Sequence, residues 1–214
     1  IYIDVEGDEW EETIDRSETL VKECTLSSKE IVDKIAASGI VGLGGATFPT
    51  QVKLMPPPGN KAEIVIINAV ECEPYLTSDQ AVNVNKAVIG IENNKPDAIA
   101  HLQKLAVNYK GIEIMPLKVQ YPQGGEKQLI DAVIRRQVKS GALPISAGAV
   151  VQNVGTAYAV YEAVQKNKPL FERVVTITGK AVANPSNFLV RMGTPISCLI
   201  EAAGGLPENT GKII

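Results

Sequence analysis

Closely spaced glycines early in the chain have the residue pattern of an anion-binding loop. Gly39, Gly42, Gly44 and Gly45 fall within seven residues. Glycine has no Cβ and tolerates a positive φ, so such a run lets several backbone N–H groups converge on one point. Converging N–H groups form a concave site for phosphate, and Lys53 adds a positive charge at the end of the stretch. The alternative is a tight loop that only joins two packed elements.

The spacing of these glycines differs from the fingerprint of Rossmann dinucleotide-binding folds. Gly42 and Gly44 match the first two glycines of G-x-G-x-x-G, but Thr47 occupies the third position. Phe48 and Pro49 follow and set the direction in which the chain leaves the loop. The stretch therefore predicts a phosphate-binding loop that lacks the Rossmann fingerprint.

Polar side chains follow the next predicted strand. Residues 64–67 are Ile-Val-Ile-Ile, a run typical of a buried parallel strand, and Asn68, Glu71 and Glu73 come soon after it. Open α/β sheets bind ligands beyond the carboxyl ends of their strands. An amide and two carboxylates at such an end predict a site for a polar ligand. The alternative for the two carboxylates is a solvated pair in a turn.

Together the two stretches resemble the C subunit of the Rnf electron-transport complex, a family related to the flavin- and NADH-binding subunit of respiratory complex I. Gly-Leu-Gly-Gly-Ala-Thr-Phe-Pro-Thr and Asn-Ala-Val-Glu-Cys-Glu-Pro-Tyr are similar to the two flavin-site motifs of that family. Two shorter matches follow, at 121–126 and 152–156. The resemblance covers nearly the whole chain.

The resemblance also implies which residues contact the cofactors. The implied cofactor-binding residues are Gly42, Gly44, Gly45, Phe48, Lys53, Asn68, Glu71, Glu73, Tyr121, Gly124, Glu126, Asn153 and Thr156. Among them, Lys53 is expected to direct its ammonium toward the glycines, and Glu73 is the predicted catalytic carboxylate beside the nicotinamide. Leu43, Val70 and Gly125 stand where the complex I pattern has Arg, Asp and Glu. No metal-binding residues are expected.

The activity implied by the resemblance is hydride exchange between NADH and FMN, with electrons passing to iron–sulfur clusters. The chain has no C-x-x-C-x-x-C run, so 4Fe-4S clusters are expected only in regions outside it. The resemblance implies an NADH-dependent oxidoreductase, part of a ferredoxin:NAD oxidoreductase, that meets other subunits at the cytoplasmic face of the membrane. The alternatives are a soluble cobalamin reductase-type flavoprotein and a non-enzymatic scaffold with a vestigial flavin site.

Composition limits the class of protein. The chain has 214 residues, 45% hydrophobic and 21% charged, with a net charge of −3, so it is long and apolar enough for a packed core. The sequence has no basic block of the kind that binds nucleic acid. It also has no apolar run that approaches the roughly 18 residues of a membrane helix. Cys24, Cys72 and Cys198 are scattered, which fits a reducing compartment. The chain begins with Ile1, so we expect a piece of a longer protein.

The expected fold is α/β, a Rossmann-like flavin/NADH-binding domain with a small C-terminal β-grasp (SLBB-like) module. The expected domains are 1–25, the tail of a β-rich region; 26–168, the FMN/NADH-binding domain; and 169–214, the β-grasp module. Strands are predicted at 63–67, 86–91, 112–119, 149–151, 174–178 and 187–190, with helices near 28–38, 94–107, 126–139, 156–165 and 195–203. Residues 2–6 could add an edge strand.

Short signals place the ends of some of these elements. Ser27 and Glu30 have the spacing of a capping box, and Gly39 is a predicted C′ residue. The prolines of 55–59 predict an extended polyproline linker. A parallel crossover needs roughly a dozen residues, more than 79–85 supplies, so we expect residues to be absent from the chain near 80–85.

Overall fold

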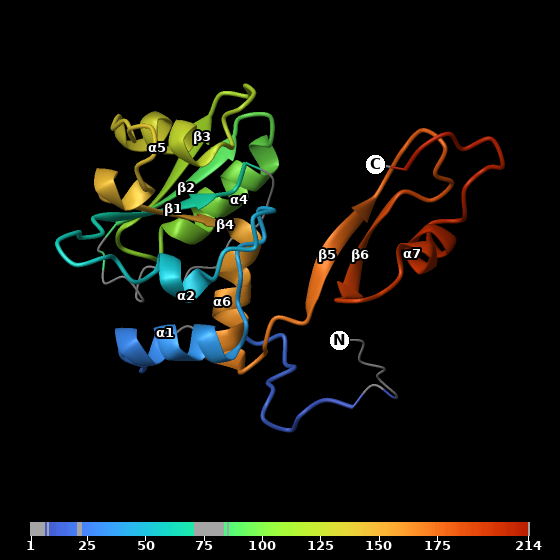
Figure 1. Cartoon of the computed structure of the whole chain (residues 1–214), viewed down its shortest axis with the longest axis horizontal. Helices are drawn as coiled ribbons and strands as arrows, with labels where there is room; N and C mark the ends of the chain where they lie inside the picture. Colours follow the sequence, from blue (N-terminus) through green and yellow to red (C-terminus); the bar gives the residue numbers. More distant parts are fainter. Residues whose placement is uncertain (1–6, 8, 21–22, 71–83, 85, 214) are drawn as a thin grey trace. The chain divides into compact units, whose positions relative to one another are not determined.

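The computed structural model describes residues 7, 9–20, 23–70, 84 and 86–213, and the chain forms two compact units, 1–169 and 170–214 (Figure 1). The described elements of the first unit are α1 (Ser28–Ala37), α2 (Thr50–Lys53), β1 (Ile64–Asn68), β2 (Ala87–Glu92), α4 (Pro96–Ala106), β3 (Ile112–Leu117), α5 (Glu126–Ile134), the 3₁₀ turn η1 (Pro144–Ala147), β4 (Ala149–Asn153) and α6 (Val154–Lys166). Those of the second unit are β5 (Glu172–Ile177), β6 (Ser186–Arg191) and α7 (Ile196–Ala202).

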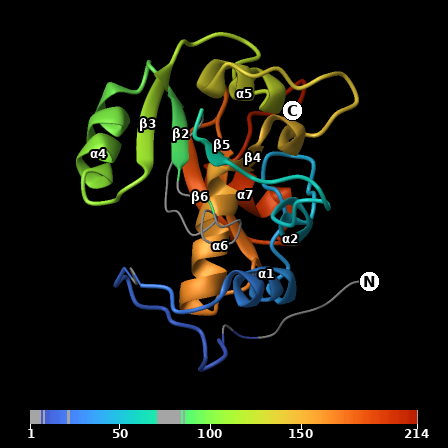
Figure 2. The ribbon, with the colours of Figure 1, turned by 90° about the vertical axis from the view of Figure 1, so that its left-hand side faces the viewer.

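The first unit is built on a parallel sheet with the strand order β3-β2-β1-β4. β1, β2 and β4 are buried along almost their whole length, as expected for parallel strands covered on both faces. β3 and β4 are the two edge strands. β3 lies beside α4 (Figure 2) and contains a proline, Pro116, as an edge strand tolerates. The chain passes from β1 outward to β3 and then returns to the other side of β1. The strand order therefore reverses between β1 and β4, where open sheets of this kind bind ligands.

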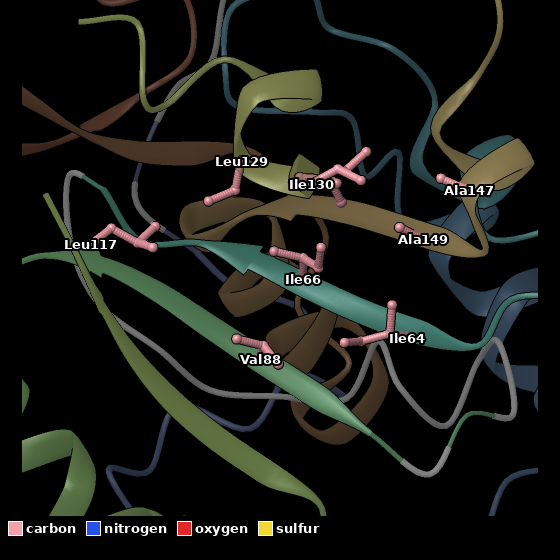
Figure 3. Packing of buried hydrophobic residues seen from close by; sticks show 9 residues of the cluster. Ile64, Ile66, Val88, Leu117, Leu129, Ile130, Ala147 and Ala149 are labelled. Atoms are coloured by element: carbon pink, nitrogen blue, oxygen red, sulfur yellow. The ribbon is translucent and has the colours of Figure 1, made fainter. Parts of the chain in front are cut away.

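Helices cover both faces of this sheet. Figure 1 shows α5 on one side, and α1, α2 and α6 on the other. Leu129 and Ile130 of α5 are fully buried and pack on Ile66 and Val88 (Figure 3). Side chains at the intervening strand positions face α6, where the helix contributes buried small and branched residues such as Val160. The strands are thus held in register by two apolar layers that leave the strand ends for other contacts.

Local signals explain where several elements begin and end. The capping box of α1 is confirmed, because Ser27 Oγ accepts from Glu30 N–H while the Glu30 carboxylate accepts from Ser27 N–H. Gly39 follows the helix with a φ of 66°, as predicted. α5 ends at Ile134 and not near 139, because Arg135 takes a left-handed conformation with a φ of 58° and its N–H bonds to Asp131 O.

One further predicted feature, the polyproline linker, differs in the structure, and two short elements were not predicted. The polyproline linker does not extend through Gly59, whose φ is 83°, because Asn60 N–H donates to Pro57 O and closes a turn. α2 and η1 have four residues each, too few to produce a hydrophobic period. The predicted edge strand at 2–6 and the expected gap near 80–85 lie outside the described residues. The predicted domain boundaries stay predictions.

The second unit is a two-stranded antiparallel hairpin with one helix. Val175 lies opposite Phe188, and Arg173 opposite Val190. Val190 and Leu199 are its most buried large side chains, at 9% exposure each. The predicted α/β fold with a small C-terminal strand–strand–helix module is therefore confirmed.

Candidate functional site

Two asparagines meet where the strand order reverses. Asn68 is the last residue of β1 and Asn153 the last of β4, and the two are register partners in adjacent parallel strands. Both were predicted as site residues from motifs far apart in the sequence. The fold therefore brings two amide side chains to one point at the carboxyl edge of the sheet, in the crevice that α/β proteins use for ligands.

The glycine loop is closed by backbone hydrogen bonds and lies against the β4–α6 junction. Val41 and Pro49 form an isolated bridge, and Gly42 N–H donates to Phe48 O at 2.9 Å. Leu43 N–H donates to Thr156 Oγ1 at 2.8 Å. A Cβ on Gly44 would lie 3.7 Å from Asn153 Cβ. The loop thus packs onto the first turn of α6, and Thr156, which is fully buried, is the side chain that holds it there.

One glycine of this loop faces open space. Gly45 has a φ of 106°, and a Cβ built on it would meet no heavy atom within 4 Å among the described residues. Thr47 also has a positive φ, 49°, which a branched residue rarely adopts. Asn153 Oδ1 accepts from Gly155 N–H and Thr156 N–H, so the start of α6 is ordered. The loop therefore places a backbone segment with two positive φ angles beside a capped helix N-terminus.

Asn68 joins β1 to the loop that follows β3. Its Nδ2 donates to Gly124 O at 2.9 Å, and its Oδ1 accepts from Val70 N–H at 3.3 Å. Val70 is buried and packs against Gly124. A Cβ on Gly125 would lie 2.5 Å from Gln128 Oε1, so the Glu of the complex I pattern would not fit there without a shift of that side chain.

Lys53 and Glu126, two predicted cofactor contacts, form an ion pair. Lys53 Nζ lies 2.5 Å from Glu126 Oε1, and the two side chains are 31% and 39% exposed. The ammonium that sequence analysis placed against the glycines is therefore bound to a carboxylate at the start of α5. Its expected contact with the glycines stays a prediction.

The remaining predicted residues divide into exposed ones and ones that the structure does not describe. Phe48 is 51% exposed and Tyr121 97% exposed, so both rings are available on the surface of these loops. Glu71 and Glu73, including the predicted catalytic carboxylate, lie outside the described residues. Their roles remain predictions.

Two polar residues near the carboxyl ends of the strands were not among the predicted cofactor contacts, although one of them, Gln152, lies in the motif at 152–156. Gln152 is 2% exposed, and within the described part of the chain its Nε2 has no hydrogen-bond partner, an unusual state for a buried amide. The signal in the sequence was a polar residue inside an apolar strand, next to Asn153. Lys95 is the second, since it binds the backbone after β1.

The described residues include neither a cluster of metal ligands nor a membrane-spanning helix. No group of three or more His, Cys, Asp or Glu side chains there could hold a metal ion. Among the described helices, none has the length and apolar character needed to cross a membrane.

Comparison with family models shows which family the chain belongs to. The family model of the Nuo51 FMN-binding domain matches residues 35–83 and 79–162, which include the glycine loop, both asparagines and α5. The chain belongs to this family. A second family model, the SLBB domain, matches 174–213 in the second unit. The two matched segments of the FMN-binding domain meet at 79–83, close to the expected gap, which stays a prediction because these residues are not described.

Curated relatives confirm the resemblance seen in the sequence. The chain is 45% identical to the C subunit of the proton-translocating ferredoxin:NAD(+) oxidoreductase complex of Clostridium ljungdahlii, over 100% of this chain and 50% of that protein. It is 43% identical to the C subunit of the Na(+)-translocating ferredoxin:NAD(+) oxidoreductase complex of Acetobacterium woodii, over 88% of this chain and 47% of that protein. The chain thus spans about half the length of these relatives.

Solved structures share the fold at low sequence identity. A NAD+-reducing NiFe hydrogenase in its H2-reduced state has a TM-score of 0.66 and 21% identity, over 83% of this chain and 39% of that chain. The air-oxidized state has a TM-score of 0.65 and 20% identity, over 84% and 39%. At this identity the likeness shows the fold alone.

Proposed function

We propose that this chain is the flavin- and NADH-binding part of the C subunit of a ferredoxin:NAD oxidoreductase complex. The observation that carries the proposal is the pairing of Asn68 with Asn153 at the strand-order reversal, with the glycine loop bonded to Thr156 beside them. The family match to an FMN-binding domain and the relatives, both C subunits of such complexes, support it.

The residues at this edge of the sheet fit FMN. The backbone around Gly45 lies beside the N-terminus of α6, and a helix N-terminus favours an anion such as phosphate. Lys53 follows the glycine loop in the sequence and would add a cation when its bond to Glu126 loosens. Phe48 and Tyr121 have exposed ring surface for stacking.

The chain's own contribution is to bind and orient the cofactors. Bound FMN would supply the hydride and single-electron chemistry, while the protein supplies position and electrostatics. The two asparagines would orient the flavin because each is fixed by a backbone hydrogen bond. The buried Thr156 would act through the glycine loop, which it holds against α6. Glu71 and Glu73 would provide the carboxylates near the nicotinamide, and Glu73 is the catalytic candidate.

The rest of the proposal concerns the assembly. We place the iron–sulfur clusters that accept the electrons in regions outside this chain. The other subunits of the complex would be its partners, and the inner face of the membrane its location, reached by association and not by a span of this segment. NADH is the proposed donor or product at the exposed side of the flavin.

FMN titration of the purified chain tests the proposal, with two glycine variants as a matched pair. Gly45 and Gly59 both have a positive φ, and a Cβ added to either would meet no heavy atom within 4 Å among the described residues. Ala therefore costs similar backbone strain at each, about 1–2 kcal/mol. Gly45→Ala should abolish quenching of flavin fluorescence, whereas Gly59→Ala should bind as the parent does. NADH should bleach the visible band of the bound flavin. A folded parent that binds no FMN would refute the proposal and favour a vestigial site.

A further inference from the structure

Lys95 is a charged residue at the carboxyl end of the sheet that no predicted motif includes. It lies in the turn between β2 and α4, where its N–H donates to Glu92 O at 3.2 Å. It is the N-cap residue of α4, with a φ of −120° and no side-chain cap bond. The side chain instead reaches the segment that follows β1, where Nζ donates to Val70 O at 2.8 Å.

The side chain of Lys95 is partly buried and makes an ion pair. The side chain of Lys95 is 28% exposed and that of its partner Glu92 is 17% exposed, with 3.3 Å between Nζ and Oε2. A lysine normally keeps its charged end in water, and fixing this long side chain costs conformational entropy. The carboxylate compensates part of the cost of desolvation. An ordered ammonium on a backbone carbonyl therefore indicates that the position of that carbonyl is constrained.

The carbonyl belongs to a chain of bonds that crosses the site. Lys95 holds Val70 O, Val70 N–H donates to Asn68 Oδ1, and Asn68 Nδ2 donates to Gly124 O. The chain links the ends of β2 and β1 to the loop after β3. Val70 is the central link, because both of its backbone polar groups and its buried side chain are engaged.

We propose that Lys95 is a positioning residue for the flavin site. It holds the backbone of Val70 after β1 and thereby keeps the Asn68 amide turned toward Gly124, beside Asn153. The proposal rests on the proposed function for the identity of the bound group. It concerns the order of this chain's own residues, so part of its test needs no cofactor.

Lys95→Met tests the proposal, because Met has similar length and no donor. Its matched control is Lys104→Met in the last turn of the same helix, an exposed lysine. In the parent without FMN, hydrogen exchange at Val70 N–H should be slow. Lys95→Met should speed exchange at Val70 N–H and leave exchange at Val151 N–H in β4 unchanged. It should also weaken FMN binding on the order of tenfold, as the loss of supporting contacts does for bound metal ions. Lys104→Met should do neither.

Two further variants separate the carbonyl bond from the ion pair. Lys95→Arg retains a donor and should recover most of the FMN affinity lost in Lys95→Met. Glu92→Gln removes the charge and leaves Lys95 free to bind Val70 O, so FMN affinity should stay within about twofold of the parent. An effect of Glu92→Gln as large as that of Lys95→Met would overturn the assignment.

The outcomes also separate this proposal from the proposed function. Unchanged exchange at Val70 in Lys95→Met overturns the positioning role, whatever the FMN result. Failure of the parent to bind FMN overturns the proposed function, and exchange at Val70 then still decides whether Lys95 orders the backbone after β1.

Discussion

The two edges of the parallel sheet carry ion pairs of different exposure. At the amino edge, where the parallel strands begin, the ion pairs are Arg136–Glu63 and Lys86–Glu113. At the carboxyl edge, where the strands end, they are Lys95–Glu92 and Lys53–Glu126. Every side chain of the first two pairs is at least 48% exposed, whereas none of the other two exceeds 39%. Exposed pairs contribute little to stability, and less exposed ones cost more to desolvate. Of these four pairs, the two costlier ones lie at the end of the sheet where the predicted cofactor contacts gather; the least exposed pair among the described residues, Lys168–Glu162 at 12% and 17%, lies at the C-terminal end of α6.

The surroundings of the glycines can also be compared between the two edges. At the amino edge, a Cβ on Gly148 would meet both Glu63 and Arg136 at 2.9 Å, and Arg136 also donates to Ala147 O. At the carboxyl edge the surroundings are mixed: a Cβ on Gly125 would lie 2.5 Å from Gln128 Oε1, whereas Gly45 faces open space among the described residues. Polar contacts at the first edge thus join the half-exposed ends of the fold, while those at the second order the loops where we propose that the flavin binds.

The largest expected effect is that of Thr156→Val. Valine keeps the shape of this fully buried side chain but removes the acceptor of Leu43 N–H. We expect the free energy of unfolding to fall by about 1–3 kcal/mol, and FMN affinity to fall more than tenfold as the glycine loop detaches from α6. Urea unfolding and flavin fluorescence measure the two effects. Thr176→Val, which removes an exposed hydroxyl bonded to Asn187, is the control and should change neither.

Opposite effects are expected from the two members of the Lys53–Glu126 pair. Lys53→Ala should weaken FMN or NADH binding, and Glu126→Gln should strengthen it severalfold by releasing the ammonium. Both effects should shrink at high salt, since they are partly Coulombic and the Debye length falls to about 3 Å at 1 M. Titrations at low and high salt measure this. The same sign for both variants would mean that Glu126 is itself a ligand contact.

Charge removal at the amino edge should have a much smaller effect. Glu63→Gln breaks the ion pair with Arg136, whose partners are about half exposed, so we expect a loss of about 0.5 kcal/mol or less in unfolding free energy. FMN affinity should not change. A change in FMN affinity as large as that of Glu126→Gln would contradict the contrast between the two edges.

The smallest effect is expected at a carboxylate away from both edges. Hydrogen bonds from Ser27 lower the pKa of Glu30 below its usual value. Because the folded pKa is depressed, the stabilisation is present above the unfolded pKa, near 4.3, and is lost as pH falls through the folded value. We expect slight fraying of α1 in this acidic range. NMR of the amides in its first turn would measure this fraying as a function of pH. Glu30→Gln should remove the pH dependence.

Much of the fold could be predicted because the pattern is local. The strand at 64–67 and the helix after Ser27 are encoded by an apolar run and a capping box, which act within a few residues. The end of α5 was misplaced because an apolar pattern continues past Ile134, while the left-handed conformation of Arg135 that stops the helix has no strong sequence signal. Helix α2 was not predicted because four residues are too few to show a hydrophobic period.

The candidate site was predicted in composition but not in arrangement. The family motifs can be read from the sequence alone, and they marked the glycine loop, Asn68, Asn153 and Glu126 as candidates. Only the tertiary structure decided that Asn68 and Asn153 are register partners, that Lys53 binds Glu126, and that Lys95 reaches Val70. The physical reason is that these contacts join positions 25 to 85 residues apart, and strand order and register, which bring them together, are set by the packing of the whole sheet between its helices and not by any local pattern.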